Sequence, residues 1–515
     1  MNRNSPHGRG LNKAVGLPGN CSPGSRPGRQ RRRCLVLLAV LFPLLIQAAQ
    51  PRYNVLLLVA DDLRPDLGGY GNRMVQSPHL DRLAAQGLRF DRAYCQEALC
   101  NPSRASFLTG LRPETLKVFD LATHFRDQRP DVVTLPQLFK QNGYVSLSIG
   151  KIFHVTNGNH DDPESWSEPP WHGPRASARP VGSTPTAAAK PKSKKKKNIT
   201  PDRSHTLPFD NPDCDDDDLL DGQIATQAIA VLNQIKNQPF FLGVGFHKPH
   251  LPFVAPRKYW ELYDPKQLQL ASNPFLPKDA PAFASNEAAE LRRYKDLPAT
   301  GPIAEETARQ LIHAYYACIS YTDAQIGRVL HELERLGLHS KTIVIFLGDH
   351  GYHLGEQGTW TKRTNWEVAT RVPLIIAAPG QKARNTGTEA LVELVDLYPT
   401  LTELCGLTPP ADLEGRSVRP LLEHPDATWK TAAFSIYPKT VPAMGRVVGR
   451  AMRTPQYRLV EWTATASGSK TYELYDEMAD PAESVNLASQ PAYRGRLHQL
   501  IQQLRAGGQH ARPKP

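Results

Sequence analysis

The chain has 515 residues and a formal net charge of +12, a length that allows two to four average domains or one large α/β domain with a smaller one. The positive charge is concentrated in residues 1–50 and 171–205, outside which 45 Lys and Arg stand against 49 Asp and Glu. Since no zinc-finger spacing, aromatic RNA-binding pattern or basic heptad accompanies it, the composition argues against a nucleic-acid partner.

The N-terminal region has the order of a secretory signal. Arg31, Arg32 and Arg33 precede the apolar run 34–46, which is followed by the small residues Ala48 and Ala49. The run has 13 residues and contains a proline, whereas a bilayer-spanning helix needs ~20. We therefore predict a signal peptide over residues 1–49 and no stable membrane span. The protein is expected to be exported, either periplasmic or secreted, or in a lysosomal-type compartment in a eukaryote.

Four apolar runs, each followed by polar or charged residues, predict strands buried on both faces. Helical patterns at residues 77–86, 226–236 and 307–336 lie between them, so strand and helix alternate as in an α/β fold. Ligands of open parallel sheets bind outside the carboxyl ends of the strands, so we expect one site built from all four ends. The predicted strands are Asn54–Ala60, Tyr144–Ile149, Phe240–Phe246 and Thr342–Leu347.

Two later regions differ from this pattern. Residues 173–205 are rich in Pro, Ala, Ser and Lys and have almost no large apolar side chain, which predicts a disordered basic insertion. After residue 425, short alternating runs at 431–437, 445–453, 457–463 and 470–475 predict a small antiparallel sheet, followed by a helix from 493 to 505. We therefore predict a catalytic domain over 52–424 and a C-terminal subdomain over 425–515.

Two of the strand ends carry candidate metal ligands. Asp61 and Asp62 follow the first strand, and Asp349 and His350 follow the last. Carboxylates are hard oxygen ligands that favour Ca²⁺ or Mg²⁺, although an isolated Asp-Asp pair is more often a turn or a helix start. The acidic run 213–218 lacks the spacing of a calcium loop and is interpreted as a solvated acidic loop.

The cysteine count points to one unusual thiol. Of the seven cysteines, Cys21 and Cys34 lie in the predicted leader, which leaves five, an odd number. In an exported protein, a thiol left over after pairing suggests another role. Cys100 is the candidate, although by itself it also fits a small buried residue ahead of a helix that starts near Pro102.

The context of Cys100 carries a family resemblance. Cys100, Pro102, Ser103 and Arg104 form a C-x-P-S-R motif, continued by the residues up to Gly110. The chain resembles the sulfatase family of the alkaline phosphatase superfamily from about residue 53 to 487. Further matching segments are 54–62 (NVLLLVADD), 150–154 (GKIFH), 246–253 (FHKPHLPF), 348–356 (GDHGYHLGE), 360–362 (WTK), 473–476 (ELYD), and the later Asp480 and Asn486.

Two departures from the commonest sulfatase pattern match the iduronate-2-sulfatase-like branch of the family. Lys151 and His154 are separated by two residues where many members have one, and His350 stands where many have Asn. The resemblance implies a large sulfatase/alkaline-phosphatase-like domain with a central, mostly parallel sheet flanked by helices. It also implies a small C-terminal subdomain with an antiparallel sheet and a helix.

For Cys100, the resemblance implies conversion to formylglycine by a formylglycine-generating or anaerobic sulfatase-maturating enzyme. The hydrated aldehyde is a geminal diol: one hydroxyl attacks sulfur, and the other then expels sulfate and restores the aldehyde, whereas a serine would remain a stable sulfate ester. One Ca²⁺ per chain would be bound by Asp61, Asp62, Asp349 and His350 together with residue 100.

The remaining roles are also carried over from the family. Arg104, Lys151 and Lys362 would contact residue 100 and the sulfate oxygens. His247 would protonate the departing sugar oxygen, and His154 would take the proton from the second hydroxyl. His250, in the same segment as His247, is a less certain member of the site.

The function expected from the resemblance is hydrolysis of sulfate esters on a sulfated glycan. Two alternatives remain: a phosphoester hydrolase of the same superfamily, and a non-catalytic glycan-binding relative in which Cys100 stays unmodified. Tyr352, His353 and Trp360 fit sugar contacts and loop packing equally well.

Overall fold

A seven-stranded sheet lies at the centre of the computed structural model, which describes residues 52–156, 159–174, 203, 205–286 and 290–510. The predicted signal peptide and nearly all of the predicted insertion 173–205 lie outside these residues. Along the sheet the strands are β11 (Thr386–Thr388), β2 (Leu88–Phe90), β10 (Leu374–Ala377), β8 (Thr342–Gly348), β1 (Asn54–Ala60), β6 (Phe240–Phe246) and β4 (Val145–Gly150).

The four predicted strands lie side by side as β4-β6-β1-β8 and are parallel. The register aligns Ala60 with both Phe246 and Gly348, so the residues after β1, β6 and β8 leave the sheet at one edge. The short strands β10 and β2 run antiparallel to their neighbours β8 and β10, and β11 pairs parallel with β2. The predicted mostly parallel α/β sheet is confirmed.

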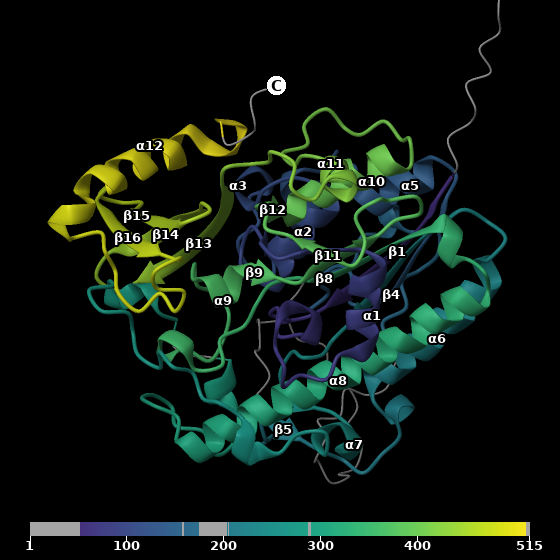
Figure 1. Ribbon diagram of the computed structural model, residues 1–515, viewed down its shortest axis with the longest axis horizontal. Coiled ribbons are helices and arrows are strands. Elements are labelled where there is room, and N and C mark those ends of the chain that lie inside the picture. The colour runs from purple at the N-terminus through teal and green to yellow at the C-terminus, as the bar shows by residue number, and fades with distance from the viewer. Residues whose placement is uncertain (1–51, 157–158, 175–202, 204, 287–289, 511–515) are drawn as a thin grey trace, which may run out of the picture. The chain divides into compact units, whose positions relative to one another are not determined.

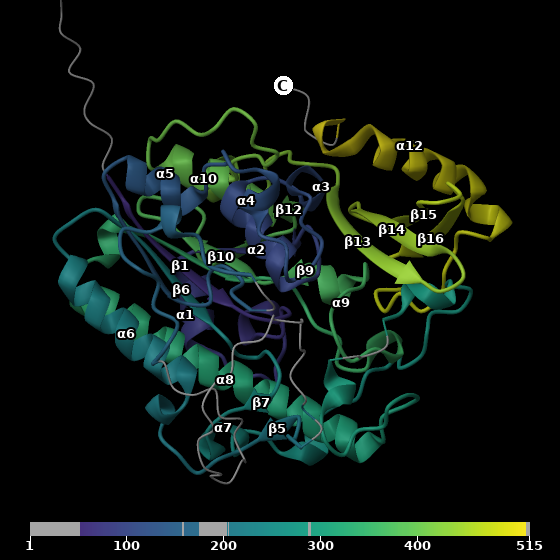
Figure 2. The same cartoon turned by 180° about the vertical axis from the view of Figure 1, so that it is seen from behind.

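Helices cover both faces of this sheet (Figures 1 and 2). In β1, alternate side chains enter different cores, because successive residues of a strand point to opposite faces: Leu56 and Leu58 join one core, and Val55 and Leu57 the other. The first core is closed by α1 (Pro78–Gln86), α6 (Leu220–Ile235) and α8 (Glu305–Arg335), and the second by α2 (Cys100–Thr109), α5 (Leu135–Gln141) and α10 (Leu397–Leu404).

The C-terminal region forms the predicted antiparallel sheet with one helix. Its strands pair in chain order: β13 (Ala433–Val441), β14 (Gly445–Arg453), β15 (Tyr457–Ala464) and β16 (Lys470–Asp476). The helix α12 (Arg494–His510) packs Leu500 and Leu504 against Met452, Leu459 and Leu474 of this sheet. This arrangement confirms the predicted fold class.

Shorter elements complete the described residues. The acidic run 213–218 is more than a solvated loop, because Asp216 accepts hydrogen bonds from Tyr259 and Gln325, and Asp217 pairs with Arg328. Among the helices described, none has both the length and the apolar character that crossing a bilayer requires. The shorter elements are β3 (Ala93–Tyr94), β5 (Phe209–Asp210), β7 (Phe253–Val254), β9 (Arg371–Val372), β12 (Val392–Glu393), α3 (Pro113–Leu116), α4 (Phe125–Gln128), α7 (Arg257–Trp260), α9 (Glu367–Thr370) and α11 (Arg419–Glu423).

The expected pairing of the other cysteines is wrong for the part of the chain that the structure describes. Cys95, Cys100, Cys214, Cys318 and Cys405 are all free thiols. Three of the other four, Cys95, Cys318 and Cys405, are buried and act as small apolar side chains. The odd number of cysteines pointed to Cys100, although the assumption that the other four pair in disulfides is wrong.

Two glycines allow β4 and β6 to approach closely where the chain leaves the sheet. Gly150 has a φ of +76°, and a Cβ there would lie 2.1 Å from the carbonyl oxygen of Gly245. A Cβ on Gly245 would lie 1.9 Å from the carbonyl oxygen of Lys151. Glycine at both positions is therefore what lets Lys151 start directly beside the end of β6.

Gly245→Ala is expected to destabilise the protein by about 1–3 kcal/mol, because the new methyl group must push the backbone at Lys151 away. The matched control is Gly495→Ala in α12, where a Cβ meets nothing within 4 Å and the helix gains up to about 1 kcal/mol. Chemical denaturation of both variants checks this, and equal stability of Gly245→Ala and the wild type would contradict the packing argument.

Candidate active site

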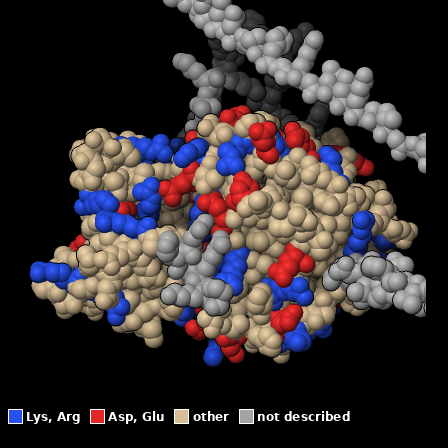
Figure 3. All heavy atoms as spheres, turned by 90° about the horizontal axis from the view of Figure 1, so that it is seen from above, with Lys and Arg blue, Asp and Glu red and all other residues tan. Residues whose placement is uncertain are grey.

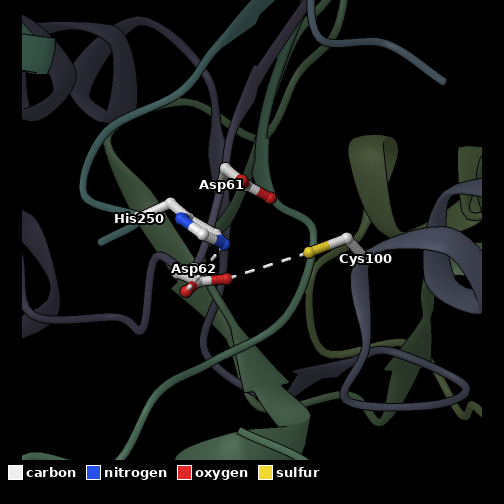
Figure 4. Close-up of side chains that lie close together, drawn as sticks. All are labelled: Asp61, Asp62, Cys100 and His250. Carbon is white, nitrogen blue, oxygen red and sulfur yellow. Dashed lines mark hydrogen bonds and ion pairs between the residues drawn. The ribbon is translucent and has the colours of Figure 1, made fainter. Parts of the chain in front are cut away.

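The acidic pairs predicted from the sequence meet at the carboxyl ends of β1 and β8. Asp61 and Asp62 follow β1, Asp349 and His350 follow β8, and Cys100 is the first residue of α2. One ligand atom from each of Asp61, Cys100, Asp349 and His350 lies within 4.8 Å of the others. Figure 4 shows the overlapping group, in which Cys100 Sγ faces Asp62 Oδ1 at 4.0 Å and His250 lies beside both aspartates.

The chemistry of this donor set fits a divalent cation. His350 Nδ1 lies 2.9 Å from the carbonyl oxygen of Gly351, which can only accept, so this nitrogen carries the proton. In the neutral ring, Nε2 is then an acceptor, and it faces Cys100 Sγ at 3.2 Å, Asp62 Oδ1 at 3.3 Å and Asp349 Oδ2 at 3.7 Å. Several acceptors converging on one buried space match a cation with mainly oxygen ligands.

Three buried cations balance the three carboxylates. Lys151 Nζ contacts Asp61, and Lys362 Nζ lies 2.9 and 2.8 Å from the two oxygens of Asp62. Arg104 donates from Nε to Asp349 at 2.8 Å and from Nη2 to Asp61 at 3.1 Å. Buried charges of this kind persist only when paired and hydrogen-bonded.

Arg104 is almost fully committed to positioning the carboxylates. Its Nη1 donates to the backbone carbonyls of Lys151 and Ile152, so four of its five N–H groups are engaged. The guanidinium thereby joins the ends of β1, β4 and β8. The sequence predicted a contact with residue 100 and sulfate, and one N–H group remains for it.

The charges in the cluster shift its pKa values. Burial alone would raise the pKa of Asp61, but Lys151 and Arg104 hold it well below its usual range. Burial raises the pKa of Asp349 even though Arg104 opposes this. Burial and the negative charge of Asp61 raise the pKa of the Cys100 thiol, so the thiolate, the reactive form of cysteine, is disfavoured.

Asp62 has a backbone conformation that is uncommon for a residue with a side chain. Its φ is +61°, in the left-handed region, which Asp tolerates better than most residues. Its N–H donates to Asp349 Oδ1 at 3.0 Å, and its carbonyl accepts from the Tyr315 hydroxyl at 2.7 Å. Strain held in this way is typical of functional sites.

The two histidines with predicted proton-transfer roles lie in strongly perturbed surroundings. Burial and the charge of Lys151 lower the pKa of His247 to about 3 and that of His154 to about 2. His154 Nε2 lies 2.8 Å from the Thr156 hydroxyl. The backbone N–H groups of His247 and Lys248 donate to the two oxygens of Asp221 at 2.9 and 2.8 Å, which fixes the turn after β6.

The candidate sugar contacts near Asp349 pack inside the protein instead. Tyr352 is fully buried and donates to the carbonyl of Trp360 at 3.0 Å. His353 is fully buried and lies 2.8 Å from the Thr364 hydroxyl. Of the two interpretations left open by the sequence, these contacts match loop packing.

Sequence reasoning missed several residues that hold the site. Asp221 and Tyr315 act through hydrogen bonds to backbone groups, and Glu290 lies 3.3 Å from Lys362 Nζ. None belongs to a local motif, and only the tertiary fold brings them in. Asp221 lies in the first turn of α6, which begins before the predicted helix 226–236, so the prediction did not include it.

A family model described as Sulfatase matches residues 53–407, and one described as N-sulphoglucosamine sulphohydrolase, C-terminal, matches residues 355–509. Iduronate 2-sulfatase of Mus musculus is 35% identical over 527 residues, covering 88% of this chain and 94% of that protein. The Homo sapiens protein of the same name is 35% identical over 525 residues, covering 87% and 93%.

The chain belongs to the sulfatase family. It is an enzyme that hydrolyses sulfuric esters and is similar to iduronate 2-sulfatases, as the resemblance predicted. Among solved structures, a phosphonate monoester hydrolase from Silicibacter pomeroyi has a TM-score of 0.71 and 24% identity, covering 89% of this chain and 96% of that one. At that identity the match supports the fold of the sulfatase and not its substrate.

The sulfatase is expected to gain stability from a divalent cation, because ligand binding to the folded state raises the free energy of unfolding by ~2.7 kcal/mol at a concentration of 100 Kd. Thermal unfolding with EDTA, then with added Ca²⁺ or Mg²⁺, measures this as a rise in Tm. Asp349→Asn should lose the rise. The control is Asp323→Asn, which removes a buried carboxylate that accepts a hydrogen bond from the Leu80 N–H at the start of α1. This variant should have a lower Tm but the same rise in Tm on addition of the cation. If Asp349→Asn retained the rise in Tm, the assignment of Asp349 as a cation ligand would be wrong.

Proposed function

We propose that this sulfatase removes sulfate from a sulfated saccharide, of the glycosaminoglycan type, outside the cytoplasm. The observation that carries the proposal is the convergence of Cys100, three aspartates and His350 with Arg104, Lys151 and Lys362 at one edge of the sheet. The names of the 35% identical relatives, iduronate 2-sulfatases, support a glycan as the substrate.

The proposed cofactor is one Ca²⁺ per chain. Asp61, Asp62, Asp349 and His350 would hold it together with residue 100, since their ligand atoms already face one buried space. A bound Ca²⁺ supplies positive charge that polarises sulfate oxygens and lowers the pKa of a coordinated hydroxyl. Oxygen ligands from three carboxylates favour this ion over a thiol-loving metal.

Residue 100 is proposed to act as formylglycine, made from Cys100 by a separate maturating enzyme. The raised pKa of the thiol supports this, because an unmodified, protonated thiol is a poor nucleophile. The modified residue would supply a geminal diol, which allows both sulfate transfer and sulfate release. The position of Cys100 supports this proposal: it is the first residue of α2, and its Sγ lies 3.2 Å from His350 Nε2 in the cluster of proposed cation ligands.

The lysines are proposed to bind the sulfate oxygens. Lys151 and Lys362 now pair with Asp61 and Asp62, the same carboxylates that would hold the cation. If those carboxylate oxygens coordinated the cation, the two ammonium groups would be available to donate hydrogen bonds to the sulfate oxygens. Arg104 would hold the carboxylates of Asp61 and Asp349 in position, and its remaining N–H group would be available to residue 100 or sulfate.

His247 is proposed to protonate the departing sugar oxygen, and His154 to accept a proton from residue 100. With its pKa at about 3, His247 is neutral at ordinary pH in the free protein. A sulfate ester held beside it raises that pKa, because a nearby negative charge favours the imidazolium. Asp221 holds the turn that carries His247, so the ring approaches from a fixed direction.

The proposed function also includes the organisation of the chain. We propose that the chain is exported through a signal peptide at 1–49. We also propose a catalytic domain at 52–424, a disordered insertion at 173–205 and a C-terminal subdomain at 425–515. In the described part, the C-terminal sheet contacts the segment that leads to Cys100, because Ile436 N–H donates to the Gln96 carbonyl at 2.7 Å. We therefore expect the subdomain to be required for activity.

Peptide mass spectrometry of the protein from its native host should show residue 100 as an aldehyde in place of a thiol. Cys100→Ala should abolish hydrolysis of an aryl sulfate, while Cys405→Ala, a buried thiol elsewhere, should retain it. An unmodified thiol in native protein, with no sulfatase activity, would overturn the mechanism and favour a glycan-binding role.

His247→Ala should slow hydrolysis of a sulfated saccharide by about 10²–10⁴-fold, the usual effect of losing a general acid. The same variant should slow 4-nitrophenyl sulfate much less, because nitrophenolate departs without protonation. Steady-state kinetics on both substrates check this, with His498→Ala on the exposed face of α12 as the control. Equal losses on both substrates would show that His247 does not protonate the leaving group.

A further inference from the structure

Glu290 connects the proposed sulfate-binding lysine to the mouth of the site. Its Oε2 lies 3.3 Å from Lys362 Nζ, and its Oε1 lies 3.0 Å from Arg203 Nη1 and 3.6 Å from His250 Nε2. These partners come from three separate segments of the chain. Glu290 is therefore a fourth carboxylate of the site, one that belongs to neither of the candidate metal groups.

The exposure of these side chains shows where the site opens. The side chains of Glu290, Arg203 and His250 are 27%, 28% and 20% exposed, whereas that of Lys362 is 5% exposed. The ring of Tyr294 lies under the Arg203 guanidinium at 4.9 Å and is itself buried. Glu290 and Arg203 thus line the solvent side of the site, next to the buried lysine, where the part of a ligand beyond its sulfate must lie.

The charge of Glu290 is fixed by its neighbours. Burial alone would raise its pKa, but Lys362, His250 and Arg203 hold it well below the usual range, so the carboxylate is ionised at any ordinary pH. An ionised carboxylate only accepts hydrogen bonds. It attracts a hydroxyl and repels a second anion, a repulsion that costs most where water is partly excluded.

Glu290 lies close enough to the proposed sulfate-binding Lys362 for its negative charge to act on the substrate. A sulfate held on Lys362 places the sugar carbons beside its ester bond within reach of a carboxylate 3.3 Å from that lysine. A hydroxyl on the neighbouring carbon can donate to Glu290. A second sulfate on that carbon would face the same carboxylate, and Arg203, which could otherwise attract it, is already paired with Glu290.

We propose that Glu290 is a specificity determinant of this sulfatase: it favours a sulfate ester flanked by a free hydroxyl over one flanked by a second sulfate. The proposal rests on the proposed function of the site and adds the class of saccharide that the site accepts. Rejection by like charge is a general way to gain specificity. Neutralising Glu290 would both remove the repulsion and free Arg203 to bind the second sulfate.

The test compares three substrates: a monosulfated sugar with a free neighbouring hydroxyl, the same sugar sulfated at both positions, and 4-nitrophenyl sulfate. For the wild type, kcat/KM should be higher for the monosulfated than for the disulfated sugar. Glu290→Gln should lower this ratio by about tenfold or more, because the like-charge repulsion is lost. Glu290→Asp, which keeps the charge, should retain a ratio above one.

Two controls separate specificity from a purely structural role. Glu114→Gln removes a half-exposed carboxylate paired with Arg450 away from the site and should leave all three rates unchanged. If Glu290→Gln lowers all three rates equally, Glu290 merely positions Lys362 and the proposal is overturned. If the wild type cleaves the aryl sulfate but shows no preference between the sugars, the proposal also fails; a wild type inactive on all three overturns the proposed function itself and the specificity with it.

Discussion

The arrangement of the site depends on the balance of charge among three buried carboxylates. Asp61, Asp62 and Asp349 are all buried, and each unpaired charge there would cost several kcal/mol. Their counter-charges come from an α2 arginine, a lysine after β4 and a lysine in a loop after β8. In each of these ion pairs the two partners come from different segments of the chain, so the folded sheet is what makes the site electrostatically possible. Figure 3 shows the contrast with the surface, where Lys and Arg lie among Asp and Glu over one face.

The C-terminal sheet belongs to the same electrostatic framework. Arg458 of β15 is buried, donates to the carbonyl of Asn365 at 2.9 Å, and contacts Glu367, Glu477 and Glu483. Asn365 lies three residues after Lys362, so the small sheet fixes the loop that carries this lysine. The side chain of Asn365 also donates a hydrogen bond to the carbonyl of Gly449 in β14. A subdomain that carries no proposed catalytic group thus determines where one of them lies.

Continuous apolar runs and alternating patterns made most of the fold predictable from the sequence. The apolar run 54–60 and β14 were predicted at the bounds that the structure has, whereas α6 begins at Leu220, six residues before the predicted start. The three-residue and four-residue strands β2, β10 and β11 were missed because such lengths carry no periodicity. The metal candidates were found because they follow strands directly. Glu290, Tyr315 and Asp221 were missed because their roles depend on distant partners that no local pattern encodes.

The pairing of lysines with aspartates gives the site a further physical property. Lys151 and Lys362 neutralise Asp61 and Asp62, which on the proposed function are also ligands of the cation. On that proposal, cation and lysine would compete for the same oxygens, and the lysines would be left with unpaired positive charge once a cation was bound. A sulfate would neutralise that charge, so cation and sulfate would each increase the other's affinity, and by linkage the effect would be reciprocal. Arg104, with four of its five N–H groups engaged, and the hydrogen-bonded backbone of Asp62 would hold the carboxylates during this exchange.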